Sequence, residues 1–239
     1  FAPECLIHLA AEIASQRDPK KIQAANVDGT RDLIDACAAA GVKRFVFAST
    51  VVTGEANGEV LTEDSKLPVE TAYGHSKQEG ERMARESKLE EVIIRPSHVY
   101  GPGGWFEEEF VNRLKQPGRF AVIGSGKNWW DVVHVEDVAT AFVLATEKAP
   151  AGSLYHVVDD EPIHYYDFVA LAAGALGTGP PRRIPAWIAS LAAGKDTVKA
   201  VTRSAKSSNA HIRAELGWKP VYPTARVGIP AAVSAQRTL

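Results

Sequence analysis

The stretch KRFVFAS, Lys43 to Ser49, decides the fold of this 239-residue chain. Its consecutive apolar side chains are typical of a strand that is covered on both faces, as the strands of a parallel sheet are. Two further runs share this pattern: CLIHLAA at Cys5–Ala11 precedes it, and EVIIRP at Glu91–Pro96 follows it. The three runs therefore predict three strands of one buried parallel sheet.

Helical patterns connect these strands. An apolar stripe with helical spacing runs from about Pro19 to Ala40, and Gly41 provides a stop. A second helix is predicted from about residue 71 to Ser87, between the second and third strands. Because strands that alternate with helices are typical of parallel sheets, the predicted fold class is α/β, a doubly wound parallel sheet.

The rhythm of strands and helices changes beyond residue 98. Short strands, turns and helices follow, which indicates a smaller, mostly helical second domain. We therefore predict a first domain at 1–98 and a second at 99–239, with residues 129–150 packing back on the first. Within that segment, DVVHVEDV indicates a short strand that leads into a helix with Asp137 as its N-cap.

The composition disfavours several classes of function. Hydrophobic residues make up 45% and charged residues 23%, the formal net charge is −2, and no basic stripe indicates a nucleic-acid partner. No apolar run approaches the length needed to span a bilayer, so no membrane partner is predicted. The seven histidines are scattered and do not pair with a cysteine, so no metal site is predicted. Cys5 and Cys37 fall in predicted buried positions, which favours a reducing cytoplasm over a disulfide framework.

The stretch TAYGHSK, Thr71 to Lys77, indicates chemistry. Tyr73 and Lys77 are four residues apart, so a helix brings both to one face. A phenol with a pKa near 10 exchanges protons more readily when a neighbouring ammonium favours the phenolate. The pair alone is a weak signal, because a solvent-facing helical turn has the same pattern. Ser49 strengthens it, since this residue ends a strand at the edge where ligands bind to parallel sheets.

Together with these residues, further motifs make the chain resemble the extended short-chain dehydrogenase/reductase family, the NAD-dependent epimerase/dehydratase group. The matching stretches occur in family order over nearly the whole chain: LIHLAA, NVDGT, GVKRFVFAST, TAYGHSK, RPSHVYGPGG, DVVHVEDVA and AELGWKP. The resemblance implies a Rossmann-like sheet and an NAD(P)-dependent oxidoreductase that interconverts a carbonyl and an alcohol. The family's catalytic roles fall on Ser49, Tyr73 and Lys77.

The resemblance also implies which residues lie along the cofactor, NAD or NADP. Besides Tyr73 and Lys77, they are Leu9, Ala10, Ala11, Asn26, Pro96 and Ser97. The family's N-terminal glycine-rich phosphate cradle has no counterpart in the sequence, and Phe1 falls just before what resembles the fourth strand. Three explanations remain open: part of a longer protein, a natural truncation that binds the cofactor weakly or across subunits, and a relic without redox activity.

Three residues are predicted to face the substrate: Thr50, His98 and Trp130. Members of the resembling family that act on nucleotide sugars usually have asparagine at the first motif position, here His98, and a diphosphate-binding arginine at the second, here Trp130. Losing a guanidinium from a phosphate site is not a neutral change, so a small or apolar ketone, aldehyde or alcohol is favoured. A nucleotide-sugar epimerase or dehydratase and a non-enzymatic binding protein are the alternatives.

The first predicted strand also suggests an assembly. If no strand precedes it, its outer edge contains neither proline nor lysine to prevent pairing with another chain. A second copy of the chain would cover this edge. We therefore predict a homodimer or higher homo-oligomer, with residues 5–11 or the helix after them in the interface.

Overall fold

The computed structural model describes residues 3–13, 15–16, 18–116, 118, 120–194, 198 and 201–235. The strands are β1 (Cys5–His8), β2 (Arg44–Ala48), β3 (Val60–Leu61), β4 (Glu90–Pro96), β5 (His98–Tyr100), β6 (Ala121–Ile123), β7 (Trp129–Trp130), β8 (Val132–His134), β9 (Ser153–Val157), β10 (Ile163–His164), β11 (Arg182–Ile184) and β12 (Lys206–Ser207). The helices are α1 (Pro19–Ile22), α2 (Gly29–Ala40), α3 (Ala72–Glu86), α4 (Gly104–Phe106), α5 (Asn112–Leu114), α6 (Val135–Lys148), α7 (Tyr165–Leu176), α8 (Ala186–Ala193), α10 (Ala210–Leu216) and α11 (Ala225–Ala235). The π-helical stretches η1 (Gln23–Asp28) and η2 (Glu107–Val111) continue α-helical runs.

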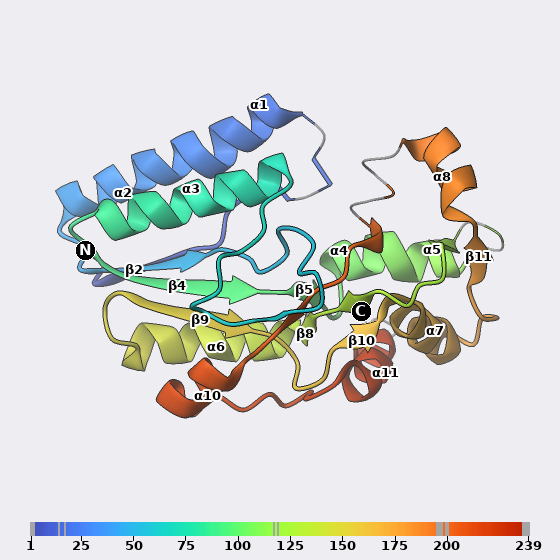
Figure 1. Cartoon of the computed structure of the whole chain (residues 1–239). Helices are drawn as coiled ribbons and strands as arrows, with labels where there is room; N and C mark the ends of the chain where they lie inside the picture. The colour runs from blue at the N-terminus through green and yellow to red at the C-terminus, as the bar shows by residue number, and fades with distance from the viewer. Residues whose placement is uncertain are drawn as a thin grey trace.

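The central sheet has the strand order β1, β2, β4, β9, and each neighbouring pair is parallel (Figure 1). Side chains of β2 alternate between its faces: Phe45 and Phe47 point into one helical layer and Val46 into the other, all fully buried. The α/β, Rossmann-like fold predicted from the sequence is thereby confirmed. β1 ends at His8, earlier than predicted.

Helices cover both faces of this sheet (Figure 1). On one face, α2 and α3 contribute Ile34 and Met83 to a buried cluster with the β2 phenylalanines. On the other face, α6 contributes Val138 and Phe142. Because both faces are covered, a ligand reaches the sheet at the ends of its strands.

The helical run between β1 and β2 confirms the helix predicted from Pro19 to Ala40. Asp18 caps its start by accepting a hydrogen bond from the backbone N–H of Lys20 at 2.9 Å. Gly41 ends it in the left-handed region, at a φ of 75°. The middle of the run is the π-helical η1, which the apolar spacing does not reveal.

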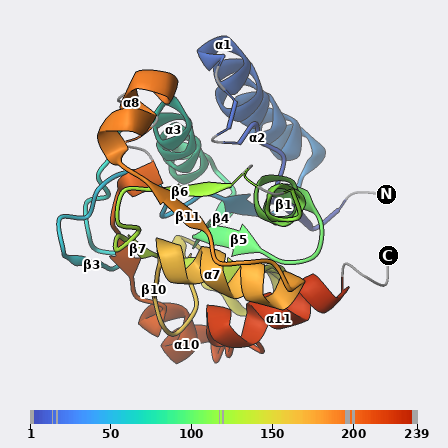
Figure 2. The same ribbon diagram turned by 90° about the vertical axis from the view of Figure 1, so that its right-hand side faces the viewer.

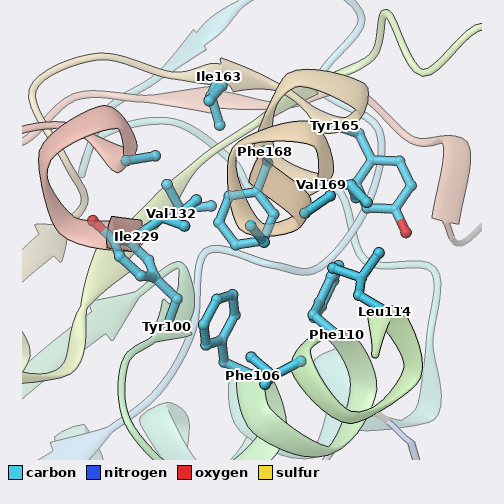
Figure 3. Close-up of a cluster of buried hydrophobic side chains, with 14 of the residues drawn as sticks. Tyr100, Phe106, Phe110, Leu114, Val132, Ile163, Tyr165, Phe168, Val169 and Ile229 are labelled. Atoms are coloured by element: carbon cyan, nitrogen blue, oxygen red, sulfur yellow. The ribbon is translucent and has the colours of Figure 1, made fainter. Parts of the chain in front are cut away.

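The second half of the chain packs around an aromatic core (Figure 3). Tyr100, Phe106, Phe110 and Phe168 are almost fully buried, and several of their rings meet edge to face. α7 and α11 lie side by side along this core (Figure 2). Within the predicted segment 129–150, α6 packs on β2 and β4. The domain division at residue 98 stays a prediction.

The cap of α6 differs from the prediction. His134 is the N-cap, because its Nδ1 accepts a hydrogen bond from the backbone N–H of Glu136 at 3.3 Å. The carboxylate of Asp137 accepts from the backbone N–H groups of Val221 at 2.6 Å and Tyr222 at 3.0 Å. Asp137 therefore fastens the C-terminal part of the chain to α6 and does not cap the helix.

β1 forms the outer strand of the central sheet within the described residues. It pairs with β2, and the side chains of Ile7 and Leu9 beside its edge are 40% and 61% exposed. Exposed apolar side chains at an open edge suit an interface. The predicted oligomer stays a prediction.

Candidate functional site

The predicted site lies at the carboxyl end of β2. Ser49 and Thr50 directly follow the last residue of the strand, and both are buried. Consecutive residues of an extended chain point in opposite directions. The two hydroxyls therefore belong to different surroundings, although the sequence places them side by side.

α3 brings the tyrosine and lysine to this strand end. Thr71 caps the helix by accepting a hydrogen bond from a backbone N–H of the first turn at 3.0 Å. Helical geometry then aligns Tyr73 with Lys77. Gly80 lets α3 approach the sheet closely, because a Cβ at this position would lie only 2.4 Å from the ring of Phe47.

Tyr73 is partly buried. Burial raises the pKa of Tyr73 to about 12, while the charge of Arg203 and a hydrogen bond with the Thr50 side chain act to lower it. The Thr50 hydroxyl also donates to the carbonyl oxygen of Pro96 at 3.3 Å. The phenol is therefore protonated at neutral pH and is held next to a second hydroxyl.

Lys77 lies behind the tyrosine, inside the fold. Its Nζ donates to the carbonyl oxygen of Ala48 at 2.8 Å and lies 5.2 Å from the ring centre of Phe47 and 5.9 Å from that of Tyr73. Burial lowers the pKa of Lys77 to about 8, and the charge of Glu81 opposes this change. Lys77 is therefore mostly charged at neutral pH.

Arg203 is a site residue that the sequence analysis missed. We expected Lys77 to supply the charge that favours the phenolate, but the cation that lowers the pKa of Tyr73 in the structure is Arg203. It comes from the segment before β12, far along the chain, and no spacing rule connects it with Tyr73. Only the three-dimensional fold brings the two residues together.

Ser49 belongs to a different cluster. Its hydroxyl donates a short hydrogen bond to Oε1 of Glu81, and Arg95 forms a bidentate pair with the same carboxylate at 2.7 and 2.6 Å. The Ser49 hydroxyl is thus engaged with Glu81. The catalytic role of Ser49 and the substrate-binding role of Thr50 stay predictions.

Several of the residues predicted to line the cofactor lie after β1 and at the end of β4, the two strands that flank β2 in the sheet. Leu9 and Ala10 follow β1 and are exposed, and Ala11 is partly exposed. Pro96 ends β4, and Ser97 follows it with a buried hydroxyl that has no hydrogen-bond partner among the described residues. An unpaired buried hydroxyl is available to a ligand.

Asn26 holds the loop after β1 in place through hydrogen bonds. Its Oδ1 accepts from the backbone N–H of Glu12 at 2.8 Å, and its Nδ2 donates to the Glu12 carbonyl and to Oγ of Ser76, each at 2.9 Å. The side chain is therefore fully occupied in tying the loop after β1 to α3. Direct contact with a cofactor, as the resemblance implies, remains a prediction.

These residues fit one end of a nicotinamide dinucleotide. The exposed loop after β1, the free Ser97 hydroxyl and the charged Lys77 provide an apolar wall, a hydrogen-bonding group and a cation. The connection from β1 to α1, residues 9–18, contains no glycine. It therefore offers no glycine turn through which the backbone could approach a pyrophosphate.

His98 and Trp130 form an aromatic wall near the strand ends. Their rings stack with centres 4.1 Å apart and planes at 6°. His98 Nδ1 lies 2.9 Å from the carbonyl oxygen of Asp131, and burial lowers the pKa of His98 to about 3, so the ring is neutral. Trp130 is only 6% exposed and is part of the aromatic core, yet it lines a small cavity together with His98 and Arg203.

Two other kinds of site are not found in the described part of the chain. No helix there is long and apolar enough to cross a membrane. No group of three or more histidine, cysteine, aspartate or glutamate side chains there could hold a metal ion.

Comparison with known proteins identifies the family. The model of the NAD-dependent epimerase/dehydratase family matches residues 1–158, more than half of the chain. The chain therefore belongs to this family, as the motifs indicated.

Individual relatives have different chemistries. The chain is 31% identical over 240 residues to a 3-diazoavenalumate denitrifying reductase from Streptomyces sp, covering 95% of this chain and 79% of the relative. It is 32% identical over 209 residues to a 3beta-hydroxysteroid-dehydrogenase/decarboxylase of Arabidopsis thaliana, covering 77% of this chain but only 36% of that protein. A dTDP-glucose 4,6-dehydratase structure from Streptomyces venezuelae with NAD matches with a TM-score of 0.84 and 25% identity, covering 98% and 73%. Other matched structures contain NADPH.

Proposed function

We propose that this chain acts as an NAD(P)-dependent oxidoreductase that interconverts a carbonyl and an alcohol on a small or apolar substrate. The observation that supports this most is the Tyr73 phenol, paired with the Thr50 hydroxyl at a strand end with Lys77 buried behind it. A proton donor, a hydrogen-bonding hydroxyl and a cation at one strand end are the groups that carbonyl reduction needs.

Tyr73 moves the proton in this proposal. During reduction it donates its proton to the carbonyl oxygen, and during oxidation it takes the proton from the alcohol. Thr50 holds the same oxygen by a hydrogen bond, and the charges of Arg203 and Lys77 stabilise the phenolate that remains. NAD(P), when bound, supplies or accepts the hydride at the carbonyl carbon.

The loop after β1 and the end of β4 hold the nicotinamide half of the cofactor in this proposal. Leu9 to Ala11 would contact it through apolar surface, and Pro96 and Ser97 would line it from β4, on the other side of β2. Asn26 keeps the first of these segments in place through Glu12. Lys77, whose Nζ lies 5.9 Å from the ring centre of Tyr73, would also donate to the cofactor.

The proposed substrate is smaller than a nucleotide sugar. Trp130 occupies the motif position at which sugar-nucleotide members usually have arginine, and its ring is packed into the aromatic core. The similarity to a dTDP-glucose 4,6-dehydratase supports the nucleotide-sugar alternative. Calorimetry with UDP-glucose separates the small-substrate proposal from the nucleotide-sugar alternative. The small-substrate proposal predicts no heat of binding, whereas micromolar affinity would favour the alternative.

Cofactor binding is the first experiment. NADH and NADPH are titrated into the protein while tryptophan fluorescence is followed, and oxidation of the bound cofactor is then measured with a panel of small ketones and aldehydes. Saturable quenching and substrate-dependent oxidation are expected. Absence of both would favour a non-enzymatic role. The dimer and a cytoplasmic location also remain predictions, and light scattering tests the first.

A further inference from the structure

The short helix α8 carries large apolar side chains that are turned away from the protein. Trp187, Ile188 and Leu191 are 68%, 42% and 82% exposed, whereas Ala189 is only 4% exposed. Since each residue of a helix turns by about 100°, the three large side chains fall within one arc and Ala189 lies on the opposite side. α8 therefore rests on the protein by a small side chain and presents its large ones outward.

α8 also stands at the margin of the molecule. Figure 1 and Figure 2 both place it beyond β11, the short strand that connects it to the rest of the fold. β11 itself is held by its parallel pairing with β6. The outward side of α8 is therefore a convex ridge on a fixed base.

Positive charge lies directly before this ridge. Arg182 and Arg183 are exposed, and neither forms an ion pair in the described part of the chain. The guanidinium of Arg183 lies 3.9 Å from the ring centre of Tyr166, a neutral partner. Residues 168–195 contain no aspartate or glutamate. Because five residues span at most about 18 Å, the arginines and Trp187 belong to one small patch.

A cleft beside Arg182 extends the positive surface. It has a volume of about 360 Å³ and lies between the end of α5 and the connection from α7 to β11. Its buried lining includes Leu114, Phe120 and Pro181, while Lys115 and Arg182 are exposed. Among the described residues, no carboxylate lines this cleft. An anionic group at its mouth would meet two cations and no opposing charge.

We propose that α8 and the cations beside it form a docking surface for an anionic lipid bilayer, on which the protein rests without spanning it. Tryptophan and leucine on one side of a helix, with arginine nearby, are the side chains that hold helices in a membrane interface. Membrane contact was not predicted from the sequence, because spanning requires a long apolar run, whereas a helix that lies in the interface can be short.

A second copy of the chain suits this surface less well. In a two-fold interface, α8 would pack against the same helix of the other copy. Arg182 and Arg183 would then approach the equivalent arginines, and like charges at an interface disfavour association. A lipid surface supplies the opposite charge, and it deforms around a convex ridge.

Vesicle flotation tests the proposal with the whole chain. Vesicles of phosphatidylcholine are compared with vesicles that contain about 30% phosphatidylserine, which gives the surface a negative potential. The parent should bind the anionic vesicles about tenfold or more tightly. Raising the ionic strength to about 0.5 M should reduce this preference, because salt screens the attraction. The emission of Trp187 should shift to shorter wavelengths on binding, and Trp187→Phe should remove this shift.

A double variant tests the cations. Arg182→Gln combined with Arg183→Gln should weaken binding about 25-fold, because each cation near an anionic surface contributes about 1 kcal/mol. The matched control, Lys219→Gln combined with Arg226→Gln, removes the same charge from exposed positions. These positions lie after α10 and on α11, across the molecule from α8 in both views (Figures 1 and 2), so binding should change little.

A single variant tests the apolar ridge. Leu191→Gln should weaken binding to anionic vesicles roughly tenfold, because the side chain no longer gains from entering the interface. Val227→Gln changes a side chain on α11 that is 52% exposed, and it should leave binding unchanged. Thermal unfolding verifies the fold of each variant.

Several outcomes would overturn the proposal. One is equal binding to both kinds of vesicle, or binding to neither. Another is binding that survives Leu191→Gln, since charge alone would then explain the attraction. Light scattering without lipid tests the other occupant: a dimer of the parent that Leu191→Gln dissociates would show that a second copy covers α8. None of these measurements uses turnover, so their results do not depend on the proposed reaction.

Discussion

Two polar clusters flank the end of β2, and consecutive residues lead into them. Ser49 leads into a framework cluster with Glu81 and Arg95, in which one carboxylate accepts three hydrogen bonds from the other two side chains. Thr50 leads into a reactive cluster with Tyr73 and Arg203, in which partial burial raises the pKa of the phenol and lowers that of the guanidinium. A buried network whose charges are paired stiffens a fold, whereas groups left short of partners are ready to interact with a ligand.

The largest expected effect is in the reactive cluster. Tyr73→Phe removes only the phenolic oxygen, so the fold should persist while carbonyl reduction falls by roughly 100- to 10,000-fold, the usual range for a general acid–base group. The measurement is kcat/KM for NADPH oxidation with a reactive ketone, with circular dichroism as a check of the fold. Unchanged turnover would end the proposed mechanism.

The framework cluster should respond in stability. Arg95→Met leaves the Glu81 carboxylate buried without its guanidinium, and removing one partner of a buried pair costs about 3–5 kcal/mol of unfolding free energy. Urea denaturation measures the loss. Arg82→Gln breaks exposed pairs on the same helix and should change the unfolding free energy far less. If Arg95→Met lowers the unfolding free energy no more than Arg82→Gln does, the buried pair adds little to stability.

The neighbouring hydroxyls give the sharpest test of the contrast. Thr50→Val should lower kcat/KM by about 10- to 100-fold, because one hydrogen bond to the reacting oxygen is lost. Ser49→Ala should leave kcat/KM nearly unchanged and should instead lower the unfolding free energy by about 1–3 kcal/mol. The opposite pattern would return the catalytic hydroxyl role to Ser49.

Lys77 should produce an effect on stability that depends on pH. The pKa of Lys77 is about 8 in the folded protein, below its ordinary value of 10.5. Between these pH values the unfolded chain binds more protons at this residue, so the stability of the parent should rise with pH relative to Lys77→Met. Urea midpoints for both proteins at several pH values from 7 to about 10.5 measure this difference. Parallel curves would show that burial does not depress the lysine pKa.

The sequence predicted the framework of the fold better than the contents of the site. The apolar runs of β2 and β4 and the stop at Gly41 have local causes, and these elements formed where expected. The choice between Ser49 and Thr50 depends on which way a side chain points as the strand ends, which shifts with a single residue of register. Arg203 and Tyr73 are far apart in the sequence and are brought together only by tertiary packing. No local sequence pattern could therefore predict their interaction.

The π-helical η1 has a consequence for how the chain tolerates insertions and deletions. A π turn accommodates one more residue than an α turn, and each residue of a helix corresponds to about 100° of rotation. Deleting a residue within Gln23–Asp28 would wind the stretch back to an α-helix and rotate everything before it out of phase with α2. Asn26 could then no longer face both Glu12 and Ser76. The extra residue of the π-helical turn therefore sets the rotation of Asn26 relative to α2. Deleting one residue there would separate the loop after β1 from α3, although no side chain of that loop or of α3 would have been changed.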